Sequence, residues 1–296
     1  MANAQAAIMV MMVAISAAVW WLWWRRWRRF GEICPSESFP PAPINIVALV
    51  LTITYVWLSL IAVVMPEVRE PAKTISLSSV QTACAMRLVM AGILCALLAF
   101  ESRSLRGFGF TLDHWRRQVS DGLETAHASF LPVLVLLLAT SFWRVPAEKN
   151  LLLRLLEQDL GLVTLGWVLI AAVICAPLLE ELLFRVILLG WLKTRTSSTH
   201  AIGISSIAFA MVHGPLDGAA LLPLALLLGL LYDRRHSYLA VVIAHAFFNL
   251  WNIALTMAAP LAWRDLVNDP SPNIATHKRC QASHSVAAAA APGRRS

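Results

Sequence analysis

The nine residues Pro177-Leu-Leu-Glu-Glu-Leu-Leu-Phe-Arg185 place two adjacent carboxylates and an arginine in a run, residues 160–192, that is otherwise almost wholly apolar. A single charge at the centre of a membrane helix costs about 2.5–3.5 kcal/mol on insertion scales. Ionisable side chains at that depth are therefore rare, and by default they mark a functional site. This stretch is the first candidate for a site inside a membrane.

The composition is that of a polytopic membrane protein. Of the 296 residues, 58% are hydrophobic and only 14% are charged, whereas soluble domains carry about 25% charged residues. The sequence predicts an all-α fold of about eight transmembrane helices, with the active site inside the helix bundle. The predicted spans are residues 6–24, 44–65, 83–100, 126–143, 160–192, 201–213, 219–232 and 238–259.

The distribution of arginine and lysine predicts the orientation of these spans. A tryptophan cluster ends the first span and an arginine-rich stretch, residues 25–29, follows it; this order is typical of a cytoplasmic interface. The loops that begin at Glu101, Lys193 and Asp233 fall on the same side, so we expect the N-terminus outside and these four loops inside. The net charge of +7 then reflects topology and not nucleic-acid binding.

Three regions are predicted along the chain. Residues 1–150 hold transmembrane helices to which the sequence assigns no role, and residues 160–260 hold the candidate site. Residues 261–296 are rich in Ala, Gly, Arg and Ser after a turn-like segment, residues 268–273, and we expect them to be disordered. The five cysteines are scattered without a CxxC pattern, so neither a disulfide framework nor a zinc ribbon is indicated.

The two glutamates of the opening stretch face different directions. Glu181 and Arg185 are four residues apart and share a helix face, so they can form an ion pair. Glu180 lies about 100° around the helix from Glu181. A structural ion pair between two helices would explain Glu181 and Arg185, but it would leave Glu180 as an uncompensated charge or a protonated acid.

Polar residues in later spans reach the same predicted depth. At about 1.5 Å of rise per residue, Glu181 and His213 both lie about 18 Å from the inner ends of their segments. His245 and Asn249 share a helix face and lie about 10 and 16 Å from the inner end of theirs. Each histidine alone would be read as a hydrogen-bonded interior residue, and Asn249 as interhelical glue. The agreement in depth favours one common site.

These side chains suit hydrolysis of an acyl bond. A carboxylate can act as general base toward water, and histidine and asparagine can orient that water or stabilise an oxyanion. Histidine nitrogen and carboxylate oxygen also suit zinc. Covalent catalysis is not favoured, because Cys175 is off the helix face of Glu180 and the pair Ser205 and Ser206 has no base at helical spacing.

The polar residues form three motifs that resemble a known family. In chain order the motifs are Glu180-Glu181-x-x-x-Arg185, Phe209-x-x-x-His213 and His245-x-x-x-Asn249. Their order and spacing are similar to those of the CPBP family of intramembrane proteases, which includes the type II CAAX prenyl endopeptidases and the bacterial Abi proteins. The resemblance covers about residues 160–259. The glycine that often follows the motif arginine in the family is Val186 here.

The resemblance implies catalytic roles for five residues. Glu180 would be the base that activates the hydrolytic water, and Glu181, His213, His245 and Asn249 would complete the site. The histidines and Asn249 would position the water and stabilise the oxyanion.

The resemblance also implies two supporting residues. Arg185 would hold Glu181 and its helix, and Phe209 would pack against the substrate or the first motif helix. Family members have been described both as metalloproteases and as glutamic-type proteases. The sequence leaves this open: no cofactor is certain, and zinc would have Glu180, His213 and His245 as its candidate ligands.

The favoured function is therefore an intramembrane endopeptidase of a membrane-anchored protein or peptide, with the lipid bilayer as surroundings and no nucleic-acid partner. We expect an integral protein of a bacterial inner (cytoplasmic) membrane; oligomeric state and substrate are not predicted. One alternative is a non-enzymatic immunity or scaffold protein that keeps the polar site for binding. A proton-coupled transporter is less favoured, because no inverted repeat or paired broken helices are evident.

Overall fold

The computed structural model describes residues 2–33, 35, 42–65, 76–143, 152, 155–156, 159 and 161–258. Throughout these residues the regular structure is helical, without strands, and the predicted all-α fold is confirmed. The turn-like segment 268–273 and the tail 261–296, predicted to be disordered, lie outside the described residues.

Within the described part, seven helices are long and apolar enough to cross a membrane. The chain is therefore an integral membrane protein. These spans are Ala6–Phe30, Ile46–Val64, Leu77–Ser102, Trp115–Trp143, Leu162–Lys193, Pro215–Arg235 and Tyr238–Ala258. They correspond to α1 (Ala2–Phe30), α2 (Ile46–Val64), α3 (Leu77–Ser102), α4 (Trp115–Thr140) with a short extension, a composite helix, α10 (Pro215–Arg235) and α11 (Tyr238–Ala258).

The eighth predicted span is the shorter helix α9 (Ser198–Met211). Its 14 residues extend about 21 Å, less than the roughly 30 Å thickness of a bilayer core. The helix ends where Gly214 takes a φ of 90° and Pro215 opens α10. Because proline has no backbone N–H, it suits the first turn of a helix. Helices α9 and α10 therefore form a hairpin with His213 at its tip.

The four loops that the sequence assigns to one side meet at one end of the bundle. Asn45 Nδ2, before α2, donates to Glu101 Oε2 at the end of α3 at 3.1 Å. The Lys193 ammonium lies 2.6 Å from Asp233 Oδ1. The amide of Tyr238 donates to the Gly109 carbonyl at 3.1 Å. These contacts fix which helix ends lie together.

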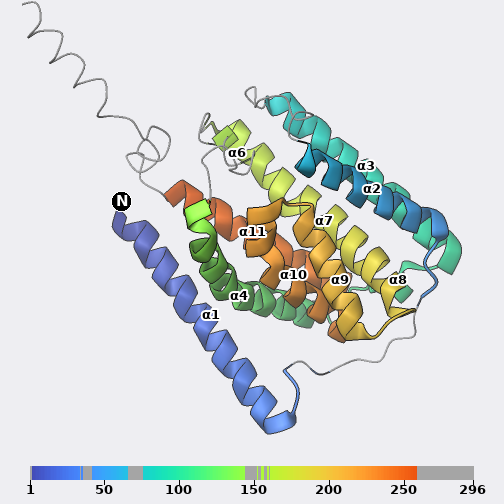
Figure 1. Cartoon of the computed structure of the whole chain (residues 1–296), viewed down its shortest axis with the longest axis horizontal. Helices are drawn as coiled ribbons and strands as arrows, with labels where there is room; N and C mark the ends of the chain where they lie inside the picture. Colours follow the sequence, from blue (N-terminus) through green and yellow to red (C-terminus); the bar gives the residue numbers. More distant parts are fainter. Residues whose placement is uncertain are drawn as a thin grey trace, which may run out of the picture.

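Helix α1 packs against α4 at a proline, where one carbonyl of α4 lacks its helical hydrogen bond. Pro132 lies inside α4 and has no N–H, so the carbonyl of Ala128, four residues earlier, lacks its helical donor. Trp20 Nε1 of α1 donates to this carbonyl at 2.8 Å and Ser16 Oγ at 3.4 Å. Figure 1 shows α1 at the edge of the bundle beside α4. Polar groups that would otherwise be unpaired inside a membrane thus hold α1 in place.

The composite helix that carries the two glutamates departs from α-helical winding in two segments. Two π-helical segments, which have wider turns than an α-helix, flank the short α-helix that ends with Glu180 and Glu181; π-helical turns inside α-helices frequently occur at functional sites. The five pieces are α6 (Leu162–Leu169), π-helical η5 (Ile170–Cys175), α7 (Ala176–Glu181), π-helical η6 (Leu182–Leu189) and α8 (Gly190–Lys193).

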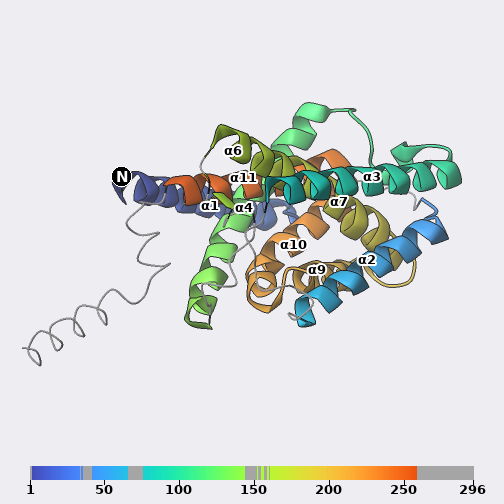
Figure 2. The ribbon, with the colours of Figure 1, turned by 90° about the horizontal axis from the view of Figure 1, so that it is seen from above.

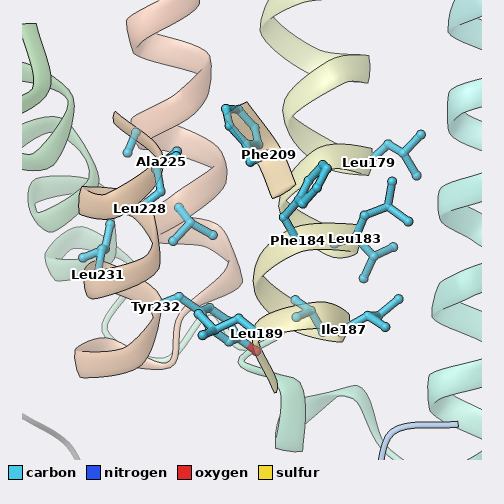
Figure 3. Close-up of a cluster of buried hydrophobic side chains, with 14 of the residues drawn as sticks. Leu179, Leu183, Phe184, Ile187, Leu189, Phe209, Ala225, Leu228, Leu231 and Tyr232 are labelled. Carbon is cyan, nitrogen blue, oxygen red and sulfur yellow. The ribbon is translucent and has the colours of Figure 1, made fainter. Parts of the chain in front are cut away.

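The composite helix is central in the bundle. Helix α7 packs against α11 and α3, and η6 packs against α9 and α2 (Figure 1, Figure 2). In the core beside it, the rings of Phe184 and Phe209 meet edge to face with centroids 5.3 Å apart. Leu179, Leu183 and Ile187 point to the other side of the same helix (Figure 3). All five side chains are buried, so a packed apolar core holds the glutamate-bearing turn from two sides.

Candidate active site

Four of the predicted residues come together around the end of α7. His213 Nε2 lies 3.7 Å from Glu180 Oε2, and His245 Nε2 lies 3.9 Å from the same oxygen. The other nitrogen of His245, Nδ1, lies 2.7 Å from Glu181 Oε1. The composite helix, the α9–α10 hairpin and α11 thus each contribute to one cluster.

Hydrogen bonds orient both imidazoles toward Glu180. Since a carboxylate only accepts hydrogen bonds, His245 Nδ1 carries the proton and donates to Glu181. His213 Nδ1 likewise donates to the Phe209 carbonyl, one turn earlier in α9, at 2.7 Å. On each ring the remaining nitrogen, Nε2, faces the Glu180 carboxylate, and in a neutral imidazole that nitrogen is an acceptor.

The two glutamates differ in their access to water. The Glu180 side chain keeps 10% of its accessible surface and the Glu181 side chain keeps none. The distances from Glu180 to the two imidazoles exceed hydrogen-bond length, and a water can bridge polar groups at such separations. Water can therefore reach Glu180, whereas Glu181 is enclosed by protein.

Glu181 is neutralised by Arg185, as the sequence predicts. Arg185 Nε lies 3.2 Å from Glu181 Oε2, and its Nη1 donates to Oε1 at 3.3 Å. Arg185 also donates to the Ala225 carbonyl of α10 at 3.2 Å. Both side chains are fully buried. The bond from Arg185 to Ala225 joins the composite helix to α10. This ion pair does not include Glu180.

Phe209 is the apolar floor of the cluster. The Arg185 guanidinium carbon lies 4.5 Å from the centroid of its ring, which is cation–π geometry. The rings of His213 and His245 have centroids 4.5 and 5.7 Å from that of Phe209. Phe209 is fully buried, so it packs against the site residues and not against solvent.

Asn249 lies apart from the glutamates. Its Nδ2 donates to the Ala172 carbonyl in η5 at 2.8 Å. It shares a face of α11 with His245 but lies one turn further along the helix. One amide N–H of Asn249 is therefore already used for a backbone contact, and a second N–H is left for other partners.

Two further polar residues lie near the site: Ser205, which was considered from the sequence only as a nucleophile, and Tyr238, which has no role predicted from the sequence. Ser205 Oγ of α9 donates to the Phe184 carbonyl at 2.7 Å, and the Tyr238 hydroxyl of α11 donates to the Leu178 carbonyl at 2.6 Å. Ser205 lies four residues before Phe209, and Tyr238 lies seven before His245. Both spacings return to the same helix face, and this was the available signal.

The zinc set left open by the sequence was compared with the geometry. Among the described residues, no group of three or more His, Cys, Asp or Glu side chains is placed to hold a metal ion. Glu180, His213 and His245 supply suitable donor types, but as they lie they do not fit a zinc centre.

One family model matches the part of the chain that contains the candidate site. Residues 162–251 match the family model described as type II CAAX prenyl endopeptidase, Rce1-like. The match begins at α6, ends in α11 and includes all three motifs. No curated protein and no solved structure matches the chain. The resemblance to the CPBP and CAAX proteases is thereby confirmed, and it implies protease activity.

Proposed function

We propose that the chain, whose residues 162–251 belong to the type II CAAX prenyl endopeptidase family, is an intramembrane endopeptidase with Glu180 as general base. One observation carries the proposal: the Nε2 atoms of His213 and His245 lie 3.7 and 3.9 Å from one oxygen of Glu180. A water among these three acceptors can give one hydrogen to the carboxylate and one to an imidazole. That orientation exposes a lone pair of the water oxygen for attack.

The proposed reaction transfers one proton twice. Glu180 takes a proton from the water as its oxygen attacks the carbonyl carbon of the scissile peptide bond. The tetrahedral intermediate collapses when the protonated Glu180 gives that proton to the leaving nitrogen. The developing oxyanion needs a donor; the second N–H of Asn249, or an imidazole Nε2 that has taken up a proton, can supply it.

We propose different roles for the remaining motif residues. Glu181 fixes the orientation of the His245 ring by accepting the hydrogen bond from Nδ1. Arg185 pairs with the Glu181 carboxylate in an otherwise apolar interior. The Phe209 ring packs against both imidazoles. None of these three side chains needs to contact the substrate.

We propose a membrane-anchored protein or peptide as the substrate. The site lies within helices that are long and apolar enough to cross a bilayer, so the scissile bond has to enter from the membrane or its surface. A membrane-anchored precursor, a C-terminal sorting tail or a bacteriocin-like peptide fits this requirement. In a bacterial inner membrane these are more suitable than a farnesylated protein.

The experiment is cleavage of a co-expressed tail-anchored substrate by the Glu180→Ala variant. We expect the variant to insert and fold but to lose cleavage. The matched control is Glu124→Gln. It removes a carboxylate of α4 that pairs with Arg26 of α1 at 2.6 Å and that is not part of the cluster, so this variant should keep cleavage. Full activity of Glu180→Ala would refute the protease mechanism, and immunity that survived this change would favour a binding protein.

Metal dependence is decided by a separate measurement. Purified protein should contain no stoichiometric zinc and should keep its activity in chelator if Glu180 works without a metal. Loss of activity in chelator, restored by added zinc, would instead show that the cluster rearranges to bind a metal.

A further inference from the structure

Three polar side chains of α11 each donate a hydrogen bond to the composite helix. Tyr238, His245 and Asn249 are seven and four residues apart, so they share one face of α11. The Tyr238 hydroxyl donates to the Leu178 carbonyl at 2.6 Å. His245 Nδ1 donates to Glu181 at 2.7 Å, and Asn249 Nδ2 donates to the Ala172 carbonyl at 2.8 Å.

Each of the two backbone carbonyls involved lacks its usual α-helical donor, the amide four residues further on. In an α-helix the amide of Ala176 would donate to the Ala172 carbonyl, four residues earlier. Here it donates to the Ala171 carbonyl, and the Asn249 amide takes its place at Ala172. The Asn249 contact thus lies just before α7.

Just after α7 the helix tightens by one residue instead of widening, and another carbonyl loses its usual donor. The amide of Leu182 would donate to the Leu178 carbonyl in an α-helix, but it donates to the Leu179 carbonyl. The Tyr238 hydroxyl donates to Leu178 instead. A backbone polar group left unpaired in an apolar interior costs free energy, so each side chain stabilises this particular winding.

We propose that Tyr238 is a positioning residue of the active site. Together with Asn249 it clamps both ends of α7 to α11, and this clamp sets the register in which His245 meets Glu180 and Glu181. This inference rests on the proposed function only where it concerns turnover; the register itself is a property of the fold.

Tyr238 is itself held by the segment between α3 and α4. Its ring stacks on Phe110, with centroids 4.1 Å apart and an interplanar angle of 22°. Its backbone amide donates to the Gly109 carbonyl at 3.1 Å. The clamp therefore links the N-terminal helices, to which the sequence assigns no role, to the position of the catalytic turn.

The test compares Tyr238→Phe with Tyr232→Phe in the full-length protein. Each change removes one hydroxyl that donates to a backbone carbonyl: Tyr238 to Leu178 at 2.6 Å, and Tyr232 to Phe108 at 3.0 Å. Tyr232 bonds the same segment between α3 and α4 that holds Tyr238, so its variant controls for loosening of that segment and for a general loss of stability, while the Tyr238 hydroxyl stays in place. Both variants keep the aromatic ring, and Tyr238→Phe keeps the stack on Phe110.

Two readouts separate positioning from folding. The first is kcat and KM for the tail-anchored substrate that the wild type cleaves. We expect kcat of Tyr238→Phe to fall about tenfold with KM within about twofold, because displacing catalytic groups by a fraction of an ångström already lowers rates. The second is the ¹⁵N signal of His245 Nδ1, assigned by its loss in His245→Gln, which we expect to shift in Tyr238→Phe alone.

The outcomes are distinguishable from a failure of the proposed function. If the wild type cleaves nothing, the protease proposal fails, while the His245 signal still decides the positioning role. If Tyr238→Phe and Tyr232→Phe give the same His245 signal as the wild type, or the same kcat as each other, Tyr238 has no positioning role.

Discussion

His245 Nδ1 lies 2.7 Å from Glu181 Oε1, while the Nε2 of the same ring lies 3.9 Å from Glu180 Oε2. One imidazole thus contacts both members of the adjacent carboxylate pair with different atoms. Glu181 receives the hydrogen bond that fixes the ring, and Glu180 faces the acceptor nitrogen. The division of the pair into a structural and a chemical carboxylate follows from this ring.

The buried pair of Glu181 and Arg185 should show strong coupling. Glu181→Gln and Arg185→Met each leave an uncompensated buried charge, and such single changes cost about 3–5 kcal/mol. The double variant removes both charges and should cost less than the sum of the single changes. The free energy of unfolding in detergent micelles measures this, and additive losses would show that the two charges are not coupled.

Substitution of His245 should lower the free energy of unfolding, whereas substitution of His213 should leave it nearly unchanged. His213→Gln should lower kcat by about 10²–10⁴, the usual range for a group that handles a proton or a water, with little change in stability. Its Nδ1 bond is to its own helix, and its side chain is 26% exposed. His245→Gln should lower both activity and stability, because it disturbs the hydrogen bond to the fully buried Glu181. Equal stability losses in the two variants would contradict this division.

Helical geometry explains why much of the site could be predicted. The rise of 1.5 Å per residue places Glu181 and His213 at similar depth once the loops are assigned to one side, and in the structure Glu180 and His213 are neighbours. The i to i+4 spacing likewise predicts the pair of Glu181 and Arg185. These features depend on local geometry and on the order of helices, and both can be read from one sequence.

Other features depend on tertiary partners and could not be predicted. At both ends of α7, Asn249 and Tyr238 donate to carbonyls that have lost the amide four residues further on. Nothing in the local sequence of α7 specifies those partners. The sequence also carries no sign of the contact between Asn249 and Ala172. The Asn249 amide was expected at the oxyanion, whereas in the structure one of its N–H groups donates to the Ala172 carbonyl. The oxyanion role of Asn249 stays a prediction.

The stability of the loop end should depend on pH through His236, which lies between two spans. Burial lowers the pKa of His236 below its usual value of 6.5, and Lys193 acts in the same direction, while the bond to the Gly107 carbonyl and Asp233 partly offset this. The unfolded chain therefore takes up the proton first as pH falls. The stabilisation should be complete above about pH 6.5 and should decrease as pH falls from there toward the folded-state pKa.

The measurement for His236 is the free energy of unfolding between about pH 5 and pH 8. His236→Asn is the suitable variant, because the residue has a φ of 46° and asparagine tolerates this left-handed backbone. The variant should lose the part of the pH dependence that lies below the usual histidine pKa. An unchanged slope in the variant would assign that dependence to other groups.

Close packing of the α9–α10 hairpin should control the position of His213. A Cβ built on Gly218 of α10 would lie 2.0 Å from the backbone oxygen of Ala210 in α9, so Gly218→Ala has to push the two helices apart. Overpacking of this kind typically costs about 1–3 kcal/mol. Since His213 follows Ala210 by three residues at the hairpin tip, its distance to Glu180 should increase and cleavage should fall.

Gly203→Ala is the matched control within α9, because a Cβ there meets nothing within 4 Å. Unfolding free energy and cleavage rate of both variants test this, and a Gly218→Ala protein as stable and active as Gly203→Ala would show that the hairpin does not set the position of His213.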